Sequence, residues 1–272
     1  MAVPANGQDA DEKAPSQSLP ETEIYLFAYD PEAGDDALSS GTNTTRRAGY
    51  DNQPYFTPAG KTFLYSRGDG IQTDIWEYEI ATGAHTQITS TEKSEYSPTP
   101  SPDGRTISMV YERNNSIWHV DRDAAVAPVW TLKNAGVEEP VGYFARNHET
   151  GDILFWSRYG YSVSLTHSEK PALHFVTGHA VPATPHVIPG TNYFSFVHRQ
   201  DNEEVWIKSL DPETRAVRPL TPIVGSNANY TWTPDGSILQ IEGAVLYRWR
   251  KGDADWQRSP TCPSTAWHPP AA

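Results

Sequence analysis

One hairpin turn recurs along the chain every 39 to 47 residues, and this repeat limits the possible folds more than any other feature. Its first copy is TPAG at 57–60, and SPDG at 101–104 and TPDG at 233–236 are later copies. Proline sets the backbone angle at one corner of such a turn, and glycine adopts the positive φ that follows. The turn glycines are Gly60, Gly104, Gly151, Gly190 and Gly236, of which Gly151 ends the degenerate copy HETG. Such spacing predicts a series of similar units.

The best-preserved unit, residues 52–89, reads as four short strands. In the second of them Phe63 and Tyr65 alternate with their neighbours, as a half-buried strand requires. The third strand is rich in aromatic and β-branched residues, which favour a pleated sheet. A four-stranded sheet cannot bury both faces alone, so it must stack on copies of itself. The predicted strands are 53–56, 61–66, 74–80 and 85–89.

A second marker keeps the same period as the turn. The third strand of each unit carries an aliphatic residue followed by an aromatic or aliphatic one, and we expect the tryptophans of this marker to pack between neighbouring sheets. Two independent markers at one period indicate a β-propeller of four-stranded antiparallel blades. The copies are Ile75-Trp76, Ile117-Trp118, Val163 with Leu165, Val205-Trp206 and Leu246-Tyr247.

Half a unit precedes the five full ones. Residues 23–30 match a third strand, 37–45 can supply a fourth, and no first or second strand precedes them. The predicted fold is therefore an all-β, six-bladed propeller whose closing blade is incomplete. Propellers usually close with strands from the other end of the chain, but the proline-rich residues after Gln257 show no apolar alternation. Either the chain end is truncated or altered, or a partner strand completes the sheet.

Composition agrees with an all-β chain and excludes several functions. The sequence has 9 Trp, 14 Tyr, 8 Phe and 23 Pro, and a net charge of −13 argues against binding nucleic acid. Cys262 is the one cysteine, so an internal disulfide is excluded. We expect no transmembrane segment and find no signal peptide in the first residues. The predicted organisation is an acidic leader at 1–20, a propeller at 21–258 and an irregular proline-rich tail at 259–272.

The SPDG turns and the third-strand marker resemble the WD-like propeller repeats of the TolB family over residues 22 to 258. The fourth repeat, counting the half-unit as the first, departs most from that pattern, because the blade at 141–177 has neither the Pro-Asp-Gly turn nor the tryptophan of the marker. This resemblance implies a bacterial, periplasmic or secreted propeller. It also implies a non-catalytic scaffold that binds a protein, peptide or small ligand at the mouth of the central channel, with no cofactor.

The segments that lead into the first strand of each blade carry the candidate site. In a propeller these segments surround the channel mouth, and several pair an aromatic ring with amide or acidic groups that can accept hydrogen bonds. The same groups could instead only satisfy backbone amides at the rim. The candidate ligand-binding residues are Tyr50, Asp51, Asn52, Gln53, Glu95, Tyr96, Glu139, His186, Asn229 and Tyr230.

Two alternatives remain open. Six-bladed propellers include metal-dependent, lactonase-like hydrolases, and here Asp51, Asn52, Glu95, Glu139 and Asn229 would have to hold calcium or zinc. The sequence has neither a G-x-S-x-G elbow nor a compact histidine ligand motif. The acidic hairpins, such as the one with Asp69 and Asp74, lack the spacing of a calcium loop. The other alternative is a chain with no independent activity because its end is altered.

Overall fold

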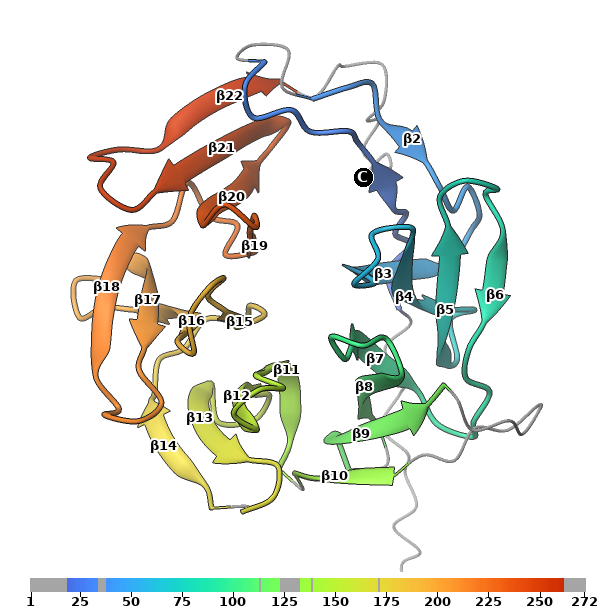
Figure 1. The fold of residues 1–272 in the computed structure, drawn as a ribbon, viewed down its shortest axis with the longest axis horizontal. Coiled ribbons are helices and arrows are strands. Elements are labelled where there is room, and N and C mark those ends of the chain that lie inside the picture. Colours follow the sequence, from blue (N-terminus) through green and yellow to red (C-terminus); the bar gives the residue numbers. More distant parts are fainter. Residues whose placement is uncertain are drawn as a thin grey trace, which may run out of the picture.

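The computed structural model describes residues 19–33, 38–112, 114–122, 133–137, 139–170 and 172–261. Throughout these residues the regular structure consists of strands, arranged as five four-stranded antiparallel blades and one two-stranded half-blade. Figure 1 shows the blades around a central opening. The predicted all-β propeller with an incomplete closing blade is confirmed. The part of the chain described here contains no helix able to span a membrane.

Each complete blade uses four consecutive strands in chain order. The first blade contains β3 (Tyr50–Phe56), β4 (Thr62–Gly68), β5 (Thr73–Glu79) and β6 (His85–Gln87). The second contains β7 (Glu95–Pro100), β8 (Thr106–Tyr111), β9 (Ser116–Asp121) and β10 (Lys133–Val137), and the third β11 (Val141–Arg146), β12 (Asp152–Ser157), β13 (Ser162–His167) and β14 (His174–Thr177). The fourth contains β15 (His186–Val187), β16 (Phe194–Arg199), β17 (Val205–Leu210) and β18 (Val217–Pro222), and the fifth β19 (Tyr230–Trp232), β20 (Ser237–Glu242), β21 (Val245–Arg250) and β22 (Gln257–Thr261).

The repeated turn forms as its sequence predicts. All five turn glycines have positive φ, from 65° at Gly60 to 84° at Gly151. At Gly60 the Thr57 carbonyl accepts a hydrogen bond from the glycine amide, 2.8 Å away, which closes the hairpin between β3 and β4. The turn therefore fixes the register of the two inner strands, and the four predicted strands of this blade all appear.

The core consists of interfaces between neighbouring blades. Leu64 and Ile75 of the first blade are fully buried against Ile107 and Met109 of the second. In the first copies of the third-strand marker, the isoleucine is the fully buried residue, whereas Trp76 is half-buried. The first blade packs on the second blade with one face and on the half-blade with the other. This removal of apolar side chains from water is the main contribution to the stability of the fold.

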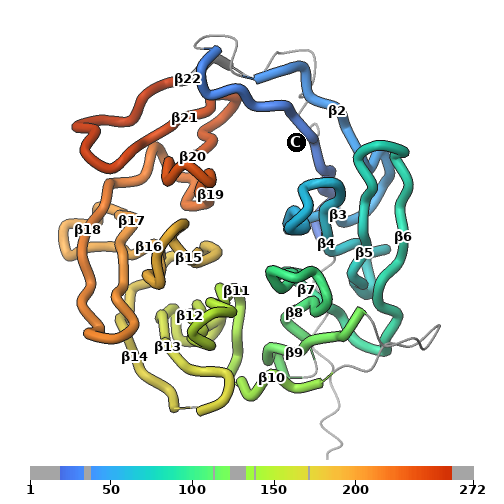
Figure 2. The backbone as a smooth tube through the Cα atoms, viewed as in Figure 1, coloured from blue at the N-terminus to red at the C-terminus, as the bar shows by residue number. Residues whose placement is uncertain are grey.

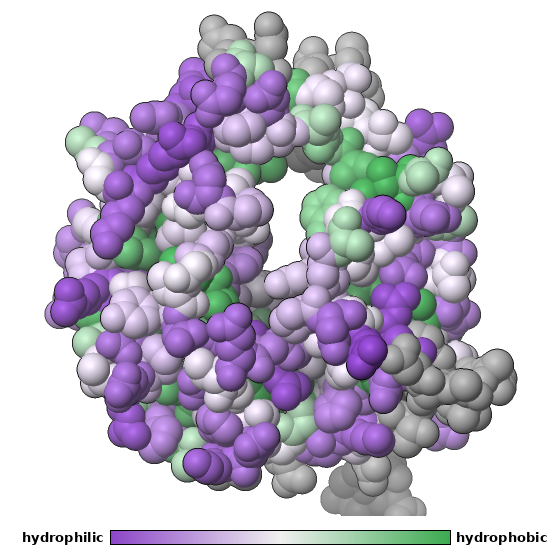
Figure 3. Space-filling model, viewed as in Figure 1, coloured by the Kyte–Doolittle hydropathy of each residue, from purple (hydrophilic) through white to green (hydrophobic). Residues whose placement is uncertain are grey.

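The half-blade lies between the first and fifth blades (Figure 2). It contains β1 (Tyr25–Leu26) and β2 (Thr42–Asn43), which pair antiparallel. Thr22 donates its amide to the Gly49 carbonyl at 3.0 Å, which joins the half-blade to the first blade. Figure 3 shows an opening through the ring whose upper right border, beside the half-blade and the first blade, is hydrophobic.

The end of the described chain corrects one boundary. We expected an irregular tail from residue 259, but β22 continues to Thr261 and pairs with β21 as the fourth strand of the fifth blade. Residues 262–272 lie outside the described residues, as does Ala37 at the start of the predicted fourth strand of the half-blade. Leu38 forms an isolated bridge with Tyr29 instead of a continuous strand.

Candidate ligand-binding face

The first strands of the blades all begin on one face of the ring, which we call the entry face. In the first blade Tyr50 pairs with Gly68, and Gly68 pairs with Thr73. The loop between β4 and β5 therefore lies on the entry face, beside the start of β3. The repeated turns, such as the one at Gly60, lie at the opposite ends of the same strands.

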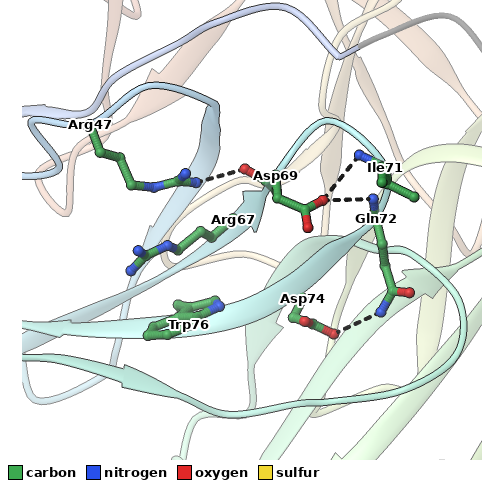
Figure 4. Close-up of a pocket in the computed structure, with 8 residues that line it drawn as sticks. Arg47, Arg67, Asp69, Ile71, Gln72, Asp74 and Trp76 are labelled. Carbon is green, nitrogen blue, oxygen red and sulfur yellow. Dashed lines mark hydrogen bonds between the residues drawn. The ribbon is translucent and has the colours of Figure 1, made fainter.

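A pocket of about 410 Å³ opens on the entry face where the half-blade meets the first blade. Figure 4 shows that its side chains come from the segment before β3, from the end of β4, from the β4–β5 loop and from β5. This volume falls in the range of small-molecule sites. The lining residues are Arg47, Arg67, Gly68, Asp69, Ile71, Gln72, Asp74 and Trp76.

Arg47 forms the side of the pocket nearest the half-blade and is tightly held. Its guanidinium donates to Asp51 Oδ1 at 2.9 Å and to the carbonyls of Gly68 and Ala48, both at 2.8 Å. The Asp51 carboxylate is buried, and burial raises its pKa although the Arg47 guanidinium opposes that shift. A buried charge requires a partner, so this ion pair ties the chain entering β3 to the end of β4.

Arg67 is held differently. The register places it between Asp51 on β3 and Asp74 on β5, so the three side chains form one cross-strand row. Its guanidinium carbon lies 4.2 Å from the centre of the Trp76 ring, a cation–π arrangement. Among the described residues Arg67 forms no ion pair, because Arg47 binds Asp51 and two amides bind Asp74. The Tyr65 hydroxyl takes one hydrogen bond from Arg67, and the remaining N–H donors of the guanidinium are available at the pocket.

Asp74 lines the pocket, and the carboxyl group of Glu95 lies near it behind the pocket wall. Gln87 donates to Asp74 at 3.0 Å, and Thr89 donates to Glu95 at 2.8 Å. Glu95 is fully buried, and burial, with a contribution from the nearby carboxyl of Asp74, raises its pKa to about 7. Asp74 is only partly buried, and burial raises its pKa as well. Two carboxyl groups close together favour a shared proton.

Asp69 caps the loop above the pocket. Its Oδ1 accepts the amide of Ile71 at 3.0 Å and the amide of Gln72 at 3.3 Å (Figure 4). These two donors lower the pKa of Asp69, so its carboxylate stays ionised at neutral pH. Ile71 beside it is 90% exposed, which leaves an apolar side chain at the rim.

The predicted channel-mouth residues separate into two groups. In the first, the rings of Tyr50 and Tyr96 meet edge to face at 6.5 Å, and Gln53 accepts the Ser97 amide at 2.8 Å, so the first and second blades are joined there. Burial raises the pKa of Tyr50, and the hydroxyls of Tyr143 and Tyr96 contribute to that shift. Tyr143 therefore belongs to this group, although it is not among the residues predicted from the sequence.

The second group joins the fourth and fifth blades. The His186 and Tyr230 rings are 4.8 Å apart, and His186 Nε2 lies 2.9 Å from the Tyr230 carbonyl oxygen. Burial lowers the pKa of His186 to about 4, so this ring is neutral. The Tyr230 hydroxyl donates to Ser195 at 2.7 Å.

The remaining predicted residues make local contacts. Asn229 bonds to Asn227, Asn52 accepts the amide of Gln53 at 2.7 Å, and Glu139 is exposed. The five residues required by the hydrolase alternative thus lie in separate local networks, and as placed they do not fit one metal ion. Among the described residues no three His, Cys, Asp or Glu side chains cluster. We therefore derive no step through a metal.

The predicted site residues include none of the residues that line this pocket. The sequence predicts a polar hairpin at Asp69 and Asp74 and a packing role for Trp76. The available signal was the order Arg67, Asp69, Asp74 and Trp76 around one hairpin, since cross-strand pairing in a four-stranded blade must place these residues close together.

No family model matches the chain, and neither does any curated protein. Among solved structures, TolB from Acinetobacter baumannii has a TM-score of 0.63 at 16% identity, over 84% of this chain and 61% of that one. A putative TolB from Agrobacterium tumefaciens has a TM-score of 0.60 at 11% identity, over 79% of this chain and 76% of that one. Oligogalacturonate lyase from Vibrio parahaemolyticus has a TM-score of 0.51 at 12% identity, over 88% and 85%.

These likenesses establish the fold. The chain is a β-propeller, and its blades are arranged as in the TolB structures, which confirms the resemblance found in the repeats. It spans 61% of the length of the Acinetobacter protein. The solved structures similar to this chain include a lyase as well as the TolB proteins. Enzymes and TolB proteins therefore share this fold.

Proposed function

We propose that this propeller is a non-catalytic scaffold that binds a protein, peptide or small ligand on its entry face. The observation that carries the proposal is the pocket at the junction of the half-blade and first blade, with Arg67 stacked on Trp76 inside it. Stacked guanidinium and indole groups are frequent at recognition sites. From the TolB resemblance, we also propose that the protein acts in the periplasm or outside a bacterial cell.

Exposed apolar side chains on the same face support this function. Ile71 is 90% exposed in the β4–β5 loop, and Tyr159 is 72% exposed in the equivalent loop between β12 and β13. Isolated exposed apolar residues are ordinary, but two of them in equivalent loops of one face, with Ile71 at the pocket, suit a contact surface. The tyrosine offers a large contact area with few rotatable bonds, a property of binding hot spots.

The scaffold is favoured over the hydrolase by what the candidate carboxylates contact. Asp51 is paired with Arg47, and Glu95 accepts from Thr89 and from Thr91. Each group joins neighbouring segments of the ring through these contacts, and among the oxygens of the two carboxyl groups Asp51 Oδ2 alone is buried without a hydrogen-bond partner. A metal site would have to break these contacts before it could assemble.

The test compares two surface tyrosines. The purified chain is immobilised as wild type, as Tyr159→Ala on the entry face and as Tyr193→Ala near the repeated turn at Gly190, where the side chain is 44% exposed. Extracts of bacterial envelopes are passed over all three. We expect Tyr159→Ala alone to lose the captured partner, and equal capture by all three would contradict the proposal. A thermal shift with calcium or zinc, which a native-state metal site would produce, would favour the hydrolase.

A further inference from the structure

We propose that the pocket between Arg47 and Trp76 binds a small zwitterion that carries both a carboxylate and an ammonium group, such as a free α-amino acid or a short peptide with free ends. This inference rests on the proposed function, because it assigns a ligand class to the same face. It comes from the charges that remain available in the pocket after the internal pairs are formed.

Arg67 supplies the carboxylate subsite. Its guanidinium is held flat near the indole of Trp76, with 4.2 Å between the guanidinium carbon and the ring centre. A guanidinium held in this way directs its N–H groups sideways in one plane, which matches the two oxygens of a planar carboxylate. The neighbouring Asp51 cannot serve as that carboxylate because Arg47 holds it.

Asp69 and Asp74 supply the ammonium subsite. Asp69 uses Oδ1 for the loop amides, and its pKa is lowered by these same bonds, so it offers an anion at the pocket wall. Asp74 lies on β5, next to Arg67 on β4, and accepts hydrogen bonds from the Gln72 and Gln87 side chains. Three hydrogens on an ammonium can reach more than one such acceptor.

The charge balance selects a zwitterion over a simple anion or cation. Arg47 and Asp51 neutralise each other, which leaves Arg67 with one positive charge and Asp69 and Asp74 with carboxyl groups. An anion would meet the two carboxyl groups, and a cation would meet the guanidinium, so each would be repelled in part. A ligand with both charges satisfies the two sides at once.

Trp76 is the apolar group inside the pocket, and Ile71 lies at the other end of the lining, beyond Asp69 (Figure 4), where it is 90% exposed. An aliphatic side chain of the ligand would lie against Trp76. The pocket of about 410 Å³ is larger than one amino acid, so either a free amino acid or a dipeptide can be accommodated.

The experiment uses the full chain and four probes: leucine, its N-acetyl derivative, its amide and the dipeptide leucyl-leucine. Titration calorimetry gives the affinity, and the indole N–H signal of Trp76, assigned with Trp76→Phe, reports the place of binding. We expect leucine or the dipeptide to bind and shift that signal, and each blocked derivative to bind at least tenfold more weakly. Equal binding of the N-acetyl derivative would overturn the ammonium subsite, and equal binding of the amide would overturn the carboxylate subsite.

Two variants with matched controls complete the test. Arg67→Gln and Asp69→Asn should each weaken binding at least tenfold, and Asn keeps the Oδ1 acceptor that closes the loop. Arg199→Gln, at the end of the same strand in the fourth blade, should not change the affinity. Neither should Asp211→Asn, whose Oδ1 accepts the amides of Glu213 and Thr214 in the same way.

Failure of this inference can be told from failure of the proposed function. If none of the probes binds while Tyr159→Ala still abolishes capture of a partner, the entry face binds proteins and the zwitterion inference is wrong. If the probes bind and the partner capture is unaffected by Tyr159→Ala, the small-ligand site stands without the protein contact.

Discussion

The first complete blade and the half-blade contain strands of the same kind but are stabilised to very different degrees. In β4, Leu64 and Tyr65 are fully buried and seven residues pair with β5. In β1, Tyr25 and Leu26 are only half-buried and only these two residues pair with β2. A sheet in this fold is therefore stable because of neighbours on both faces and on its inner edge, and not because of its own hydrogen bonds alone.

What attaches the half-blade to the ring is a small set of side contacts. Ile24 packs with Phe63 and Tyr65 of the first blade, and Arg248 of the fifth blade reaches the Pro31 carbonyl at 3.5 Å. The ion pair of Arg47 and Asp51 holds the connection between β2 and β3. This ion pair is therefore the contact whose loss should change the attachment of the half-blade most.

We expect Arg47→Gln to have the largest effect. It leaves the buried Asp51 carboxylate without its cation, which costs about 3–5 kcal/mol in the free energy of unfolding. Arg46→Gln, at an exposed neighbour, should change it by less than about 1 kcal/mol. Urea unfolding measures both. Similar stabilities for the two variants would mean that the ion pair does not join the half-blade to the first blade.

The fold was predictable because its signals are local. A turn glycine and the alternation of β-branched and aromatic residues act within a few positions, so the five blades and the half-blade could be read from the chain. The pocket could not be read in this way. Arg67 reaches Trp76 across two paired strands, and its availability depends on Arg47, which comes from the segment before the blade.

The channel-mouth residues illustrate the same limit. Asp51 and Glu95 occupy equivalent places, since they are separated by 44 residues like the turn glycines Gly60 and Gly104, and both are predicted candidates for ligand binding. In the folded ring each is buried and joined to neighbouring segments. A side chain at the channel mouth can bind a ligand, or it can hydrogen-bond to polar groups where two blades meet. The sequence does not show which of these two roles a given side chain has.

The next largest difference in stability is expected when a leucine is shortened to alanine in the first blade and in the half-blade. Leu64→Ala removes a fully buried side chain between the first and second blades, for an expected loss of about 3 kcal/mol. Leu26→Ala removes the same atoms from a half-buried strand of the half-blade and should cost about 1 kcal/mol. Chemical unfolding of both variants gives the comparison. Equal losses would show that the half-blade is as well packed as the complete blade.

The pH dependence of stability tests the buried carboxyl pair of the complete blade. Because the pKa of Glu95 is about 7 in the folded protein and 4.5 ordinarily, the folded state holds a proton between these values that the unfolded state releases. Its stabilising contribution is full below pH 4.5 and is lost as pH rises through about 7, by up to about 3 kcal/mol. Glu95→Gln should remove this loss and be more stable than wild type at pH 8. A pH profile that is unchanged in the variant would contradict the assignment.

The smallest effect is expected at the turn that the half-blade lacks. Gly60 has a φ of 65° with no atom within 4 Å of an added Cβ, so Gly60→Ala carries no clash but forces alanine into the left-handed region. This costs about 1–2 kcal/mol. Gly178→Ala has no such strain and an ordinary contact of 3.9 Å with Phe175, so it should be neutral or slightly stabilising. Thermal unfolding measures the stability of both variants. Because both substitutions add the same methyl group, a difference in stability between them gives the cost of the left-handed backbone conformation that closes the inner hairpin of a complete blade.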